Sequence, residues 1–295
     1  MEEIVIKARA KINLALDVLG KRDDGYHDIS SVMQTVSLCD TLQIKKIYKP
    51  NYGLKLATNV TWLAVDERNL VYRTAAYLKE VFAIETGIFI HIAKEIPTSA
   101  GLGGGSADCA ATLLGMRKLF KLPLSDDDLM DLAVKFGADV PFCVHGGTAH
   151  AMGIGEKLKS LPNPPFAQVL IVKPPVIVST GEVFAGFTMD KPTTRPDIDK
   201  IIHHINQGDL EGMCNEMGNV LEAVTIPLNP QIADIKRVLM AQGAMGAMMT
   251  GSGATVFGIF EKHHQMEQVA KAVKATFADI KEIFLTKFEP RRFLR

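Results

Sequence analysis

Alternating apolar positions near the N-terminus predict a long β-strand. Between residues 4 and 18 nearly every even position is apolar, whereas lysine, arginine, asparagine and aspartate occupy odd positions. This period of two is typical of a half-buried strand. Lys11 and Asn13 both stand at odd positions, so we expect them on the same face, the one directed away from the core. A turn signal in the loop 21–28 predicts that a second strand, 29–38, pairs with the first.

Helical and strand patterns alternate along the rest of the chain. The patterns predict helices over 69–81, 106–119, 125–136, 197–206 and 230–242, and strands over 88–93, 169–172 and, around a glycine turn, 244–260. Ser125 and Ser179 each have an acidic residue three positions later, which is the spacing of a capping box. Asn229 is expected to cap the helix that begins with Pro230, because proline is tolerated in the first turn.

Chain length and element order predict the fold class. The chain has 295 residues, of which 47% are hydrophobic, and this is enough for two hydrophobic cores. We therefore expect an α/β (α+β) protein with two domains, residues 1–155 and 156–295.

Charge and cysteine usage exclude several classes of function. Lysine plus arginine balances aspartate plus glutamate at 33 each, so no net field favours nucleic acid or an anionic membrane. The first residues lack the pattern of a secretory signal and no segment has the length of a membrane span, so a cytoplasmic location is expected. The four cysteines are scattered, which indicates neither a disulfide framework nor a zinc site.

A glycine-rich loop is the strongest chemical signal in the sequence. It runs over residues 97–108 as Pro-Thr-Ser-Ala-Gly-Leu-Gly-Gly-Gly-Ser-Ala-Asp and leads directly into the helix predicted at 106–119. Glycines allow close approach of the backbone to a ligand, and a helix N-terminus attracts anions, so the pattern predicts a phosphate cradle. A lone glycine cluster is more often a tight packing turn, and the helix that follows favours the cradle.

The sequence of this loop does not match two common nucleotide-binding loops. A P-loop requires lysine near its end, and no lysine occurs between Lys94 and Arg117. In a dinucleotide-binding fingerprint, Ser106 would stand where glycine or alanine belongs, and the loop lies far from the N-terminal strand. A P-loop NTPase and a Rossmann dehydrogenase are therefore weak alternatives.

Three motifs together resemble the GHMP kinase superfamily, which includes galactokinase, homoserine kinase and mevalonate kinase. The glycine-rich loop resembles its ATP-binding motif, residues 8–16 (Ala-Arg-Ala-Lys-Ile-Asn-Leu-Ala-Leu) its first motif, and residues 250–257 (Thr-Gly-Ser-Gly-Ala-Thr-Val-Phe) its third. The resemblance implies a two-domain fold, with an N-terminal mixed-sheet domain and a C-terminal α/β sandwich-like domain. Gly105 stands where serine is frequent and Ala254 where proline is frequent. Neither change removes a proposed catalytic group, so the expected class of reaction is the same.

Two further segments resemble one branch of this family. They are Asp-Gly-Tyr-His at 24–27 and Gly-Ala-Asp-Val-Pro-Phe at 137–142. The branch implies transfer of the γ-phosphoryl group of ATP, with Mg²⁺, to the 2-hydroxyl of a diphosphocytidyl polyol in non-mevalonate isoprenoid precursor synthesis. The alternatives are another GHMP small-molecule kinase, of the homoserine or mevalonate type, and a non-catalytic ligand sensor on the same fold. The resemblance further leads us to expect a monomer or weak homodimer that binds a small molecule, without nucleic acid or membrane.

The resemblance also assigns the catalytic pair. Lys11 alone on a strand would be interpreted as a solvated lysine, and Asp139 alone as the cap of a short helix. Phosphoryl transfer requires fixed positive charge and an oriented acceptor hydroxyl. By resemblance, Asp139 is the base and Lys11 its electrostatic partner.

The remaining site residues are also implied by the resemblance. Tyr26 and His27 are expected to stack on and hydrogen-bond to a cytosine ring, since an aromatic face and a polar edge suit that base. Ser106 is the candidate contact to the metal or phosphate, whereas Asp108 is expected on the helix surface. The expected ATP-binding residues are Pro97, Thr98, Ser99, Ala100, Gly101, Leu102, Gly103, Gly104, Gly105, Ser106, Ala107, Asn69 and Lys94, and the expected substrate-binding residues are Asn13, Tyr26, His27, Thr180, Phe184, Gly251, Ser252 and Gly253.

Overall fold

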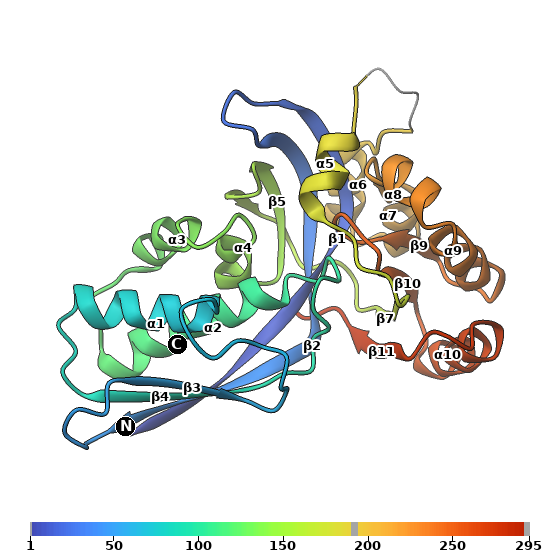
Figure 1. Cartoon of the computed structure of the whole chain (residues 1–295). Coiled ribbons are helices and arrows are strands. Elements are labelled where there is room, and N and C mark those ends of the chain that lie inside the picture. Colours follow the sequence, from blue (N-terminus) through green and yellow to red (C-terminus); the bar gives the residue numbers. More distant parts are fainter. Residues whose placement is uncertain (1, 190–193, 292–295) are drawn as a thin grey trace. The chain divides into compact units, whose positions relative to one another are not determined.

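The chain folds into two compact units, each assembled from three separate segments. The computed structural model describes residues 2–189 and 194–291 (Figure 1). Unit 1 comprises residues 1–10, 39–96 and 103–145, and unit 2 comprises 11–38, 97–102 and 146–295. A single domain boundary after residue 155 was expected from the sequence. The segments interleave instead because strands β1 (Glu3–Lys21) and β2 (His27–Ile47) each continue from one unit into the other.

Unit 1 combines a small mixed sheet with four helices. Strand β4 (Gly87–Ala93) pairs antiparallel with the second half of β2 and parallel with β3 (Leu54–Thr58). The helices are α1 (Leu70–Val81), α2 (Gly104–Phe120), α3 (Asp126–Val134) and α4 (Val140–His145). Helix α2 is buried along most of its length, so the residues at its start are held by the core of the unit.

Unit 2 contains the first half of β2 and most of β1. Strand β5 (Thr148–Gly153) pairs antiparallel with residues 29–34 of β2, and β6 (Lys157–Ser160) pairs with β5. The two-residue strand β8 (Gly218–Asn219) pairs parallel with β1 at Ala15 and Leu16. Residues 10–18 of β1 are buried on both faces, and this breaks the half-buried alternation expected from the sequence.

A second, antiparallel sheet supplies the core of unit 2. Its strand order is β11-β7-β10-β9. The strands are β7 (Gln168–Lys173), β9 (Gly246–Met249), β10 (Val256–Phe260) and β11 (Glu282–Lys287), and the helices of the unit are α5 (Thr180–Gly186), α6 (Ile198–Gln207), α7 (Leu210–Asn215), α8 (Glu222–Leu228), α9 (Gln231–Ala241) and α10 (His263–Thr276). Apolar residues of α9, α10 and this sheet form one buried cluster.

Most of the predicted elements are present, and one predicted cap is wrong. Ser125 forms a complete capping box with Asp128, and Asn69 caps α1 through a hydrogen bond from the amide of Val71. Asn229 does not cap α9 through its side chain, because its amide group donates to the carbonyl of Thr225 at the end of α8. Within 2–189 and 194–291, none of the helices is long and apolar enough to cross a membrane.

Candidate active site

The side chain of Asn13 joins two of the sequence motifs in unit 2. Its Oδ1 accepts hydrogen bonds from the Lys11 ammonium at 2.9 Å and from the backbone N–H of Gly251 at 3.1 Å. Its Nδ2 donates to the hydroxyl of Ser31 at 2.8 Å, which fixes the orientation of the amide. Lys11 and Asn13 share one face, as predicted, but both are buried rather than solvated, with 4% and 1% exposure.

The first part of the glycine-rich loop belongs to the same network. The backbone N–H of Lys11 donates to the carbonyl of Leu102 at 3.0 Å. A side chain at Gly101 would place its Cβ 2.3 Å from the carbonyl oxygen of Thr250, and Gly101 has a φ of +69°. Glycine is therefore required at position 101 for both space and backbone conformation. The structure thus brings parts of all three motifs together within unit 2.

Hydroxyl groups extend this network toward helix α5. Thr250 accepts from the backbone N–H of Asn13 at 3.1 Å, and the Ser252 and Thr180 hydroxyls lie 2.9 Å apart. Ser179 caps α5 by accepting from the amide of Glu182, which places Thr180 in the first turn. Thr180 and Ser252, predicted from separate segments to contact substrate, are therefore direct neighbours.

An aromatic pair lies at the end of the β1–β2 loop. The rings of His27 and Phe184 have centroids 5.3 Å apart and are tilted by 40°. Burial, reinforced by the positive charge of Lys21, lowers the pKa of His27 from its ordinary value and favours the neutral imidazole. Tyr26 is 58% exposed, so its ring is accessible to a ligand.

The remainder of the glycine-rich loop opens helix α2 in unit 1. Gly103 precedes the helix with a φ of +67°, and the helix begins at Gly104, two residues earlier than predicted. Gly105 is exposed and Ser106 is half-buried. The first backbone N–H groups of the helix are the donors that an anion at this end would use.

A buried ionic cluster lies beneath this first turn. The Lys94 ammonium is 2.5 Å from Oδ2 of Asp40 and 2.8 Å from Oδ2 of Asp108, and all three side chains are at most 5% exposed. Oδ1 of Asp40 accepts from the backbone N–H groups of Glu95 and Ile96. A Cβ at position 104 would lie 3.2 Å from the Lys94 ammonium, so glycine at this position makes room for the cluster.

This cluster bears on two predictions. The Lys94 ammonium is enclosed between two acidic side chains, and a place for Lys94 beside the adenine stays a prediction of the sequence. Asp108 is not a helix-surface residue, because its side chain faces the core of unit 1 and pairs with Lys94. Burial, together with the negative charge of Asp40, raises the pKa of Asp108 to about 8. Burial alone would lower the pKa of Lys94, but the charges of Asp108 and Asp40 outweigh it and raise that pKa.

The other candidates in unit 1 occupy helix starts. Asn69 is 8% exposed, and its side chain bonds to the amide of Val71 and the carbonyl of Ala64, so capping accounts for both ends of its amide. Asp139 directly precedes α4 and is half-buried, and its carbonyl accepts from the N–H of Cys143. Asp139 belongs to unit 1 and Lys11 to unit 2.

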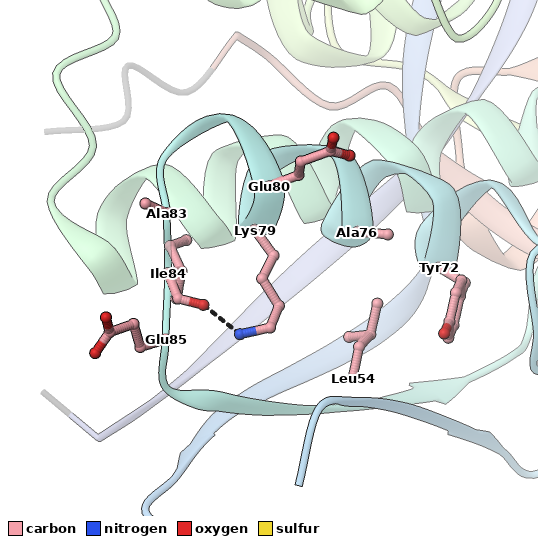
Figure 2. A pocket seen from close by; sticks show the side chains of 8 residues that line it. All are labelled: Leu54, Tyr72, Ala76, Lys79, Glu80, Ala83, Ile84 and Glu85. Atoms are coloured by element: carbon pink, nitrogen blue, oxygen red, sulfur yellow. Dashed lines mark hydrogen bonds between the residues drawn. The ribbon is translucent and has the colours of Figure 1, made fainter. Parts of the chain in front are cut away.

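Two cavities, one in each unit, lie beside other elements. Figure 2 shows a cavity of about 480 Å³ in unit 1, which residues of α1, the start of β3 and the segment 83–85 surround. None of the predicted site residues lines it. A cavity of about 770 Å³ in unit 2 lies beside β8 and includes Asn219 and Glu222 in its lining. Among the described residues, no group of three or more His, Cys, Asp or Glu side chains could hold a metal ion.

Sequence reasoning missed Asp40, Asn219 and Glu222. Asp40 stands in the series of alternate positions that Leu38, Leu42 and Ile44 make apolar, and an acidic residue at such a position is a signal that a buried partner is required. Asn219 contacts the backbone of the third motif, and Glu222 contacts that of Met249 directly before it, as described below. Asn219 gives no sequence signal, because β8 has only two residues and shows no periodicity. Glu222 is an acidic residue in the first turn of α8, which is an ordinary position for one.

Comparison with known proteins identifies the family. The family model of the GHMP kinases N terminal domain matches residues 69–147, and that of the GHMP kinases C terminal domain matches 201–279. The matches lie on either side of residue 155. The chain belongs to the GHMP kinases and is a small-molecule kinase.

Two similar proteins of known name carry the same one. A protein of Lachnospira eligens is 48% identical over 266 residues, covering 90% of this chain and 92% of that protein, and is named 4-diphosphocytidyl-2-C-methyl-D-erythritol kinase. A protein of Lachnoclostridium phytofermentans with the same name is 46% identical over 98% of both chains.

Solved structures agree with the predicted fold. A crystal structure of 4-(cytidine 5'-diphospho)-2C-methyl-D-erythritol kinase is similar with a TM-score of 0.80 at 28% identity, covering 97% of this chain and 99% of that one. A homoserine kinase from Cytophaga hutchinsonii has a TM-score of 0.79 at 20% identity, covering 99% and 96%. The prediction of a two-domain GHMP kinase fold of the mixed α/β class is confirmed.

Proposed function

We propose that this chain transfers the γ-phosphoryl group of ATP to the 2-hydroxyl of 4-diphosphocytidyl-2-C-methyl-D-erythritol, a step in isoprenoid precursor synthesis. Relatives with that named activity are similar over nearly the whole chain. The observation that carries the proposal is the side chain of Asn13, whose Oδ1 receives the Lys11 ammonium and the Gly251 amide at once. This contact ties the predicted catalytic lysine to the turn expected to face the substrate.

ATP is proposed to bind along the glycine-rich loop, through residues 97–107. Gly103 and Gly104 have no side chains that would block the approach of a phosphate to the start of α2. The N–H groups of the first turn attract phosphate oxygens. Lys94 is left out of this set and supports the helix from below through Asp108. A role for Asn69 beside the adenine stays a prediction of the sequence.

Asp139 is proposed as the base toward the acceptor hydroxyl, and Lys11 as the positive charge that accompanies the transferred group. A loose transition state for phosphoryl transfer requires little of the base beyond holding the hydroxyl in line. A buried, hydrogen-bonded lysine supplies fixed charge without reorganisation. Asn13 holds the Lys11 ammonium and is proposed to contact the substrate.

The cytidyl group is proposed to lie against His27 and Phe184, with Tyr26 packing on the base. A neutral imidazole presents one donor and one acceptor, and this suits the polar edge of cytosine. The tilted ring pair supplies an apolar wall next to that edge. Thr180 and Ser252 are proposed to contact the diphosphate through their hydroxyl groups. Gly251 and Gly253 are proposed to let the diphosphate approach the turn closely, since their own N–H groups donate to Asn13 and to the carbonyl of Thr250.

Magnesium is proposed to enter with the nucleotide. Mg²⁺ keeps several waters and is bound mainly by substrate phosphates, so it does not require a protein cage. The Ser106 hydroxyl at the start of α2 would hold the ion beside the phosphates. The bound ion would neutralise charge that develops on the phosphoryl oxygens. A cytoplasmic location and a monomer or weak homodimer stay predictions.

The test is ADP production in a coupled assay with ATP and magnesium. The acceptors compared are 4-diphosphocytidyl-2-C-methyl-D-erythritol, homoserine, mevalonate and galactose. Turnover restricted to the cytidyl compound is expected. Turnover of another acceptor alone would remove the cytidine site from the proposal, and ATP binding without turnover of any acceptor would favour a ligand sensor.

A further inference from the structure

A buried asparagine holds the backbone of the third motif from beneath. Asn219 is 5% exposed and stands in the two-residue strand β8. Its Nδ2 donates to the carbonyl oxygen of Met249 at 2.9 Å and to that of Gly251 at 2.8 Å. Its Oδ1 accepts from the backbone N–H of Leu221 at 3.0 Å, so the amide orientation is fixed by all three partners.

Two neighbouring side chains complete this support. Oε1 of Glu222 accepts from the backbone N–H of Met249 at 2.8 Å, while its Oε2 pairs with Lys236 at 2.6 Å. The hydroxyl of Thr225 donates to the carbonyl of Ser252 at 3.1 Å. Asn219 and Thr225 thus bind three backbone carbonyls between residues 249 and 252, and Glu222 binds the N–H of Met249.

The fourth carbonyl of this segment is bound within the turn itself. The carbonyl of Thr250 accepts from the N–H of Gly253 at 3.1 Å, and the N–H of Gly251 is directed to Asn13. Every carbonyl oxygen from 249 to 252 therefore has a donor. Carbonyl oxygens carry partial negative charge, so any of them released from its donor would repel an anion nearby.

We infer that Asn219 is a positioning residue that fixes the Gly251-Ser252-Gly253 turn as a receptor for the diphosphate of the acceptor substrate. Asn219 acts through the turn and does not touch the substrate. The inference rests on the proposed function, because it takes the diphosphocytidyl compound as the acceptor. It adds a residue outside the three family motifs, from a part of the chain that carries no motif.

The test is the substitution Asn219→Asp, which keeps size and shape but replaces two N–H donors by an oxygen. That oxygen would face two carbonyl oxygens and force the turn to shift. We expect KM for the cytidyl substrate to rise by about tenfold or more, and KM for ATP to change by less than about threefold. The matched control is Asn215→Asp, an identical chemical change at an exposed residue of α7.

The outcomes separate the inference from the proposed function. An equal rise in both KM values, or no rise for the cytidyl substrate, overturns the positioning role while wild-type turnover still supports the kinase. A wild-type protein that does not phosphorylate the cytidyl compound overturns both. If Asn219→Asp does not fold, Thr225→Val decides, because it removes the hydroxyl donor to Ser252 with little change of shape. A KM rise confined to the cytidyl substrate in that variant supports the role of the held carbonyls, and an unchanged KM contradicts it.

Discussion

The Lys94 ammonium lies 2.8 Å from the carboxylate of Asp108, one turn inside the helix that opens at the glycine-rich loop. A second acidic side chain, Asp40, binds the same ammonium, so two acidic groups share one positive charge in the core of unit 1, and the raised pKa of Asp108 allows it to hold a proton at neutral pH. A carboxylate near a helix start would oppose an anion bound there, and Lys94 offsets that charge. The cluster therefore links the stability of unit 1 with the charge beneath the proposed phosphate site.

Replacement of Lys94 by methionine is expected to destabilise the protein by about 3–5 kcal/mol, because it leaves two buried carboxylates without their cation. Chemical denaturation with urea would measure the change. The matched control is Lys55→Met, at an exposed position of β3, which is expected to stay within about 0.5 kcal/mol of wild type. Equal effects of the two substitutions would contradict a structural role for the cluster.

Two glycines of the same loop are expected to respond in opposite directions to alanine. At Gly101 a Cβ would meet the carbonyl of Thr250 at 2.3 Å in a left-handed backbone conformation, so Gly101→Ala should cost at least about 2 kcal/mol. At Gly105 the nearest atom would be 3.9 Å away within a helix, so Gly105→Ala should stabilise by about 0.5–1 kcal/mol. Thermal unfolding of both variants would measure this, and similar shifts in Tm would argue against the packing of Gly101 on Thr250.

How much of the structure could be predicted depends on how far apart in the sequence the interacting residues lie. The helices and strands with clear periods, such as α1 and β7, were predicted within one or two residues because local apolar spacing determines them. The burial of Lys11 and Lys94 was not predicted. Lys11 acquires partners from residues 102 and 13, and Lys94 from a carboxylate 54 positions away, and no local pattern encodes such contacts.

The same reasoning explains why the site was found only in part. Its three motifs are short and have specific sequences. The residues that support them, Asp40 and Asn219, are single polar residues that belong to no motif. For Asn229 a local sequence signal was present but led to a wrong prediction. Its residue type is typical of an N-cap, but α8 ends at that position, and its side chain bonds back to Thr225 instead.

Asp139→Asn is expected to lower kcat by about 10²–10⁴ if Asp139 acts as the base, because the amide cannot accept the hydroxyl proton. The affinity for ATP should stay within about threefold of wild type, since the proposed nucleotide contacts come from the glycine-rich loop. Steady-state kinetics and nucleotide titration would measure the two quantities. Asp131→Asn, at an exposed position of α3, is the control, and a wild-type kcat in Asp139→Asn would exclude this residue as the base.

The KM for the cytidyl substrate is expected to depend on pH through His27. Because burial and Lys21 lower the pKa of His27 below 6.5, the imidazole is neutral at pH 7. KM should be constant above that value and rise as the pH falls through the lowered pKa, since protonation removes the acceptor nitrogen.

Lys21→Met tests the cause of this dependence. Loss of the positive charge should raise the pKa of His27, so the rise in KM should begin at a higher pH than in wild type. Lys157→Met, at an exposed position of β6, should leave the profile where it is. A KM that stays constant while NMR shows the His27 imidazole becoming protonated would show that His27 does not bind the base.

The interleaved segments also have a consequence for the order in which the protein forms during synthesis. All segments of unit 1 have left the ribosome soon after residue 145, so this unit can close while the chain is still growing. Unit 2 has to wait. Asn13 can meet Lys11 and Ser31 early, but its partner Thr250 lies 237 positions further along the chain. The nascent chain therefore carries β1 with this network incomplete until the third motif is made, and this is the stage at which we expect it to depend most on chaperones.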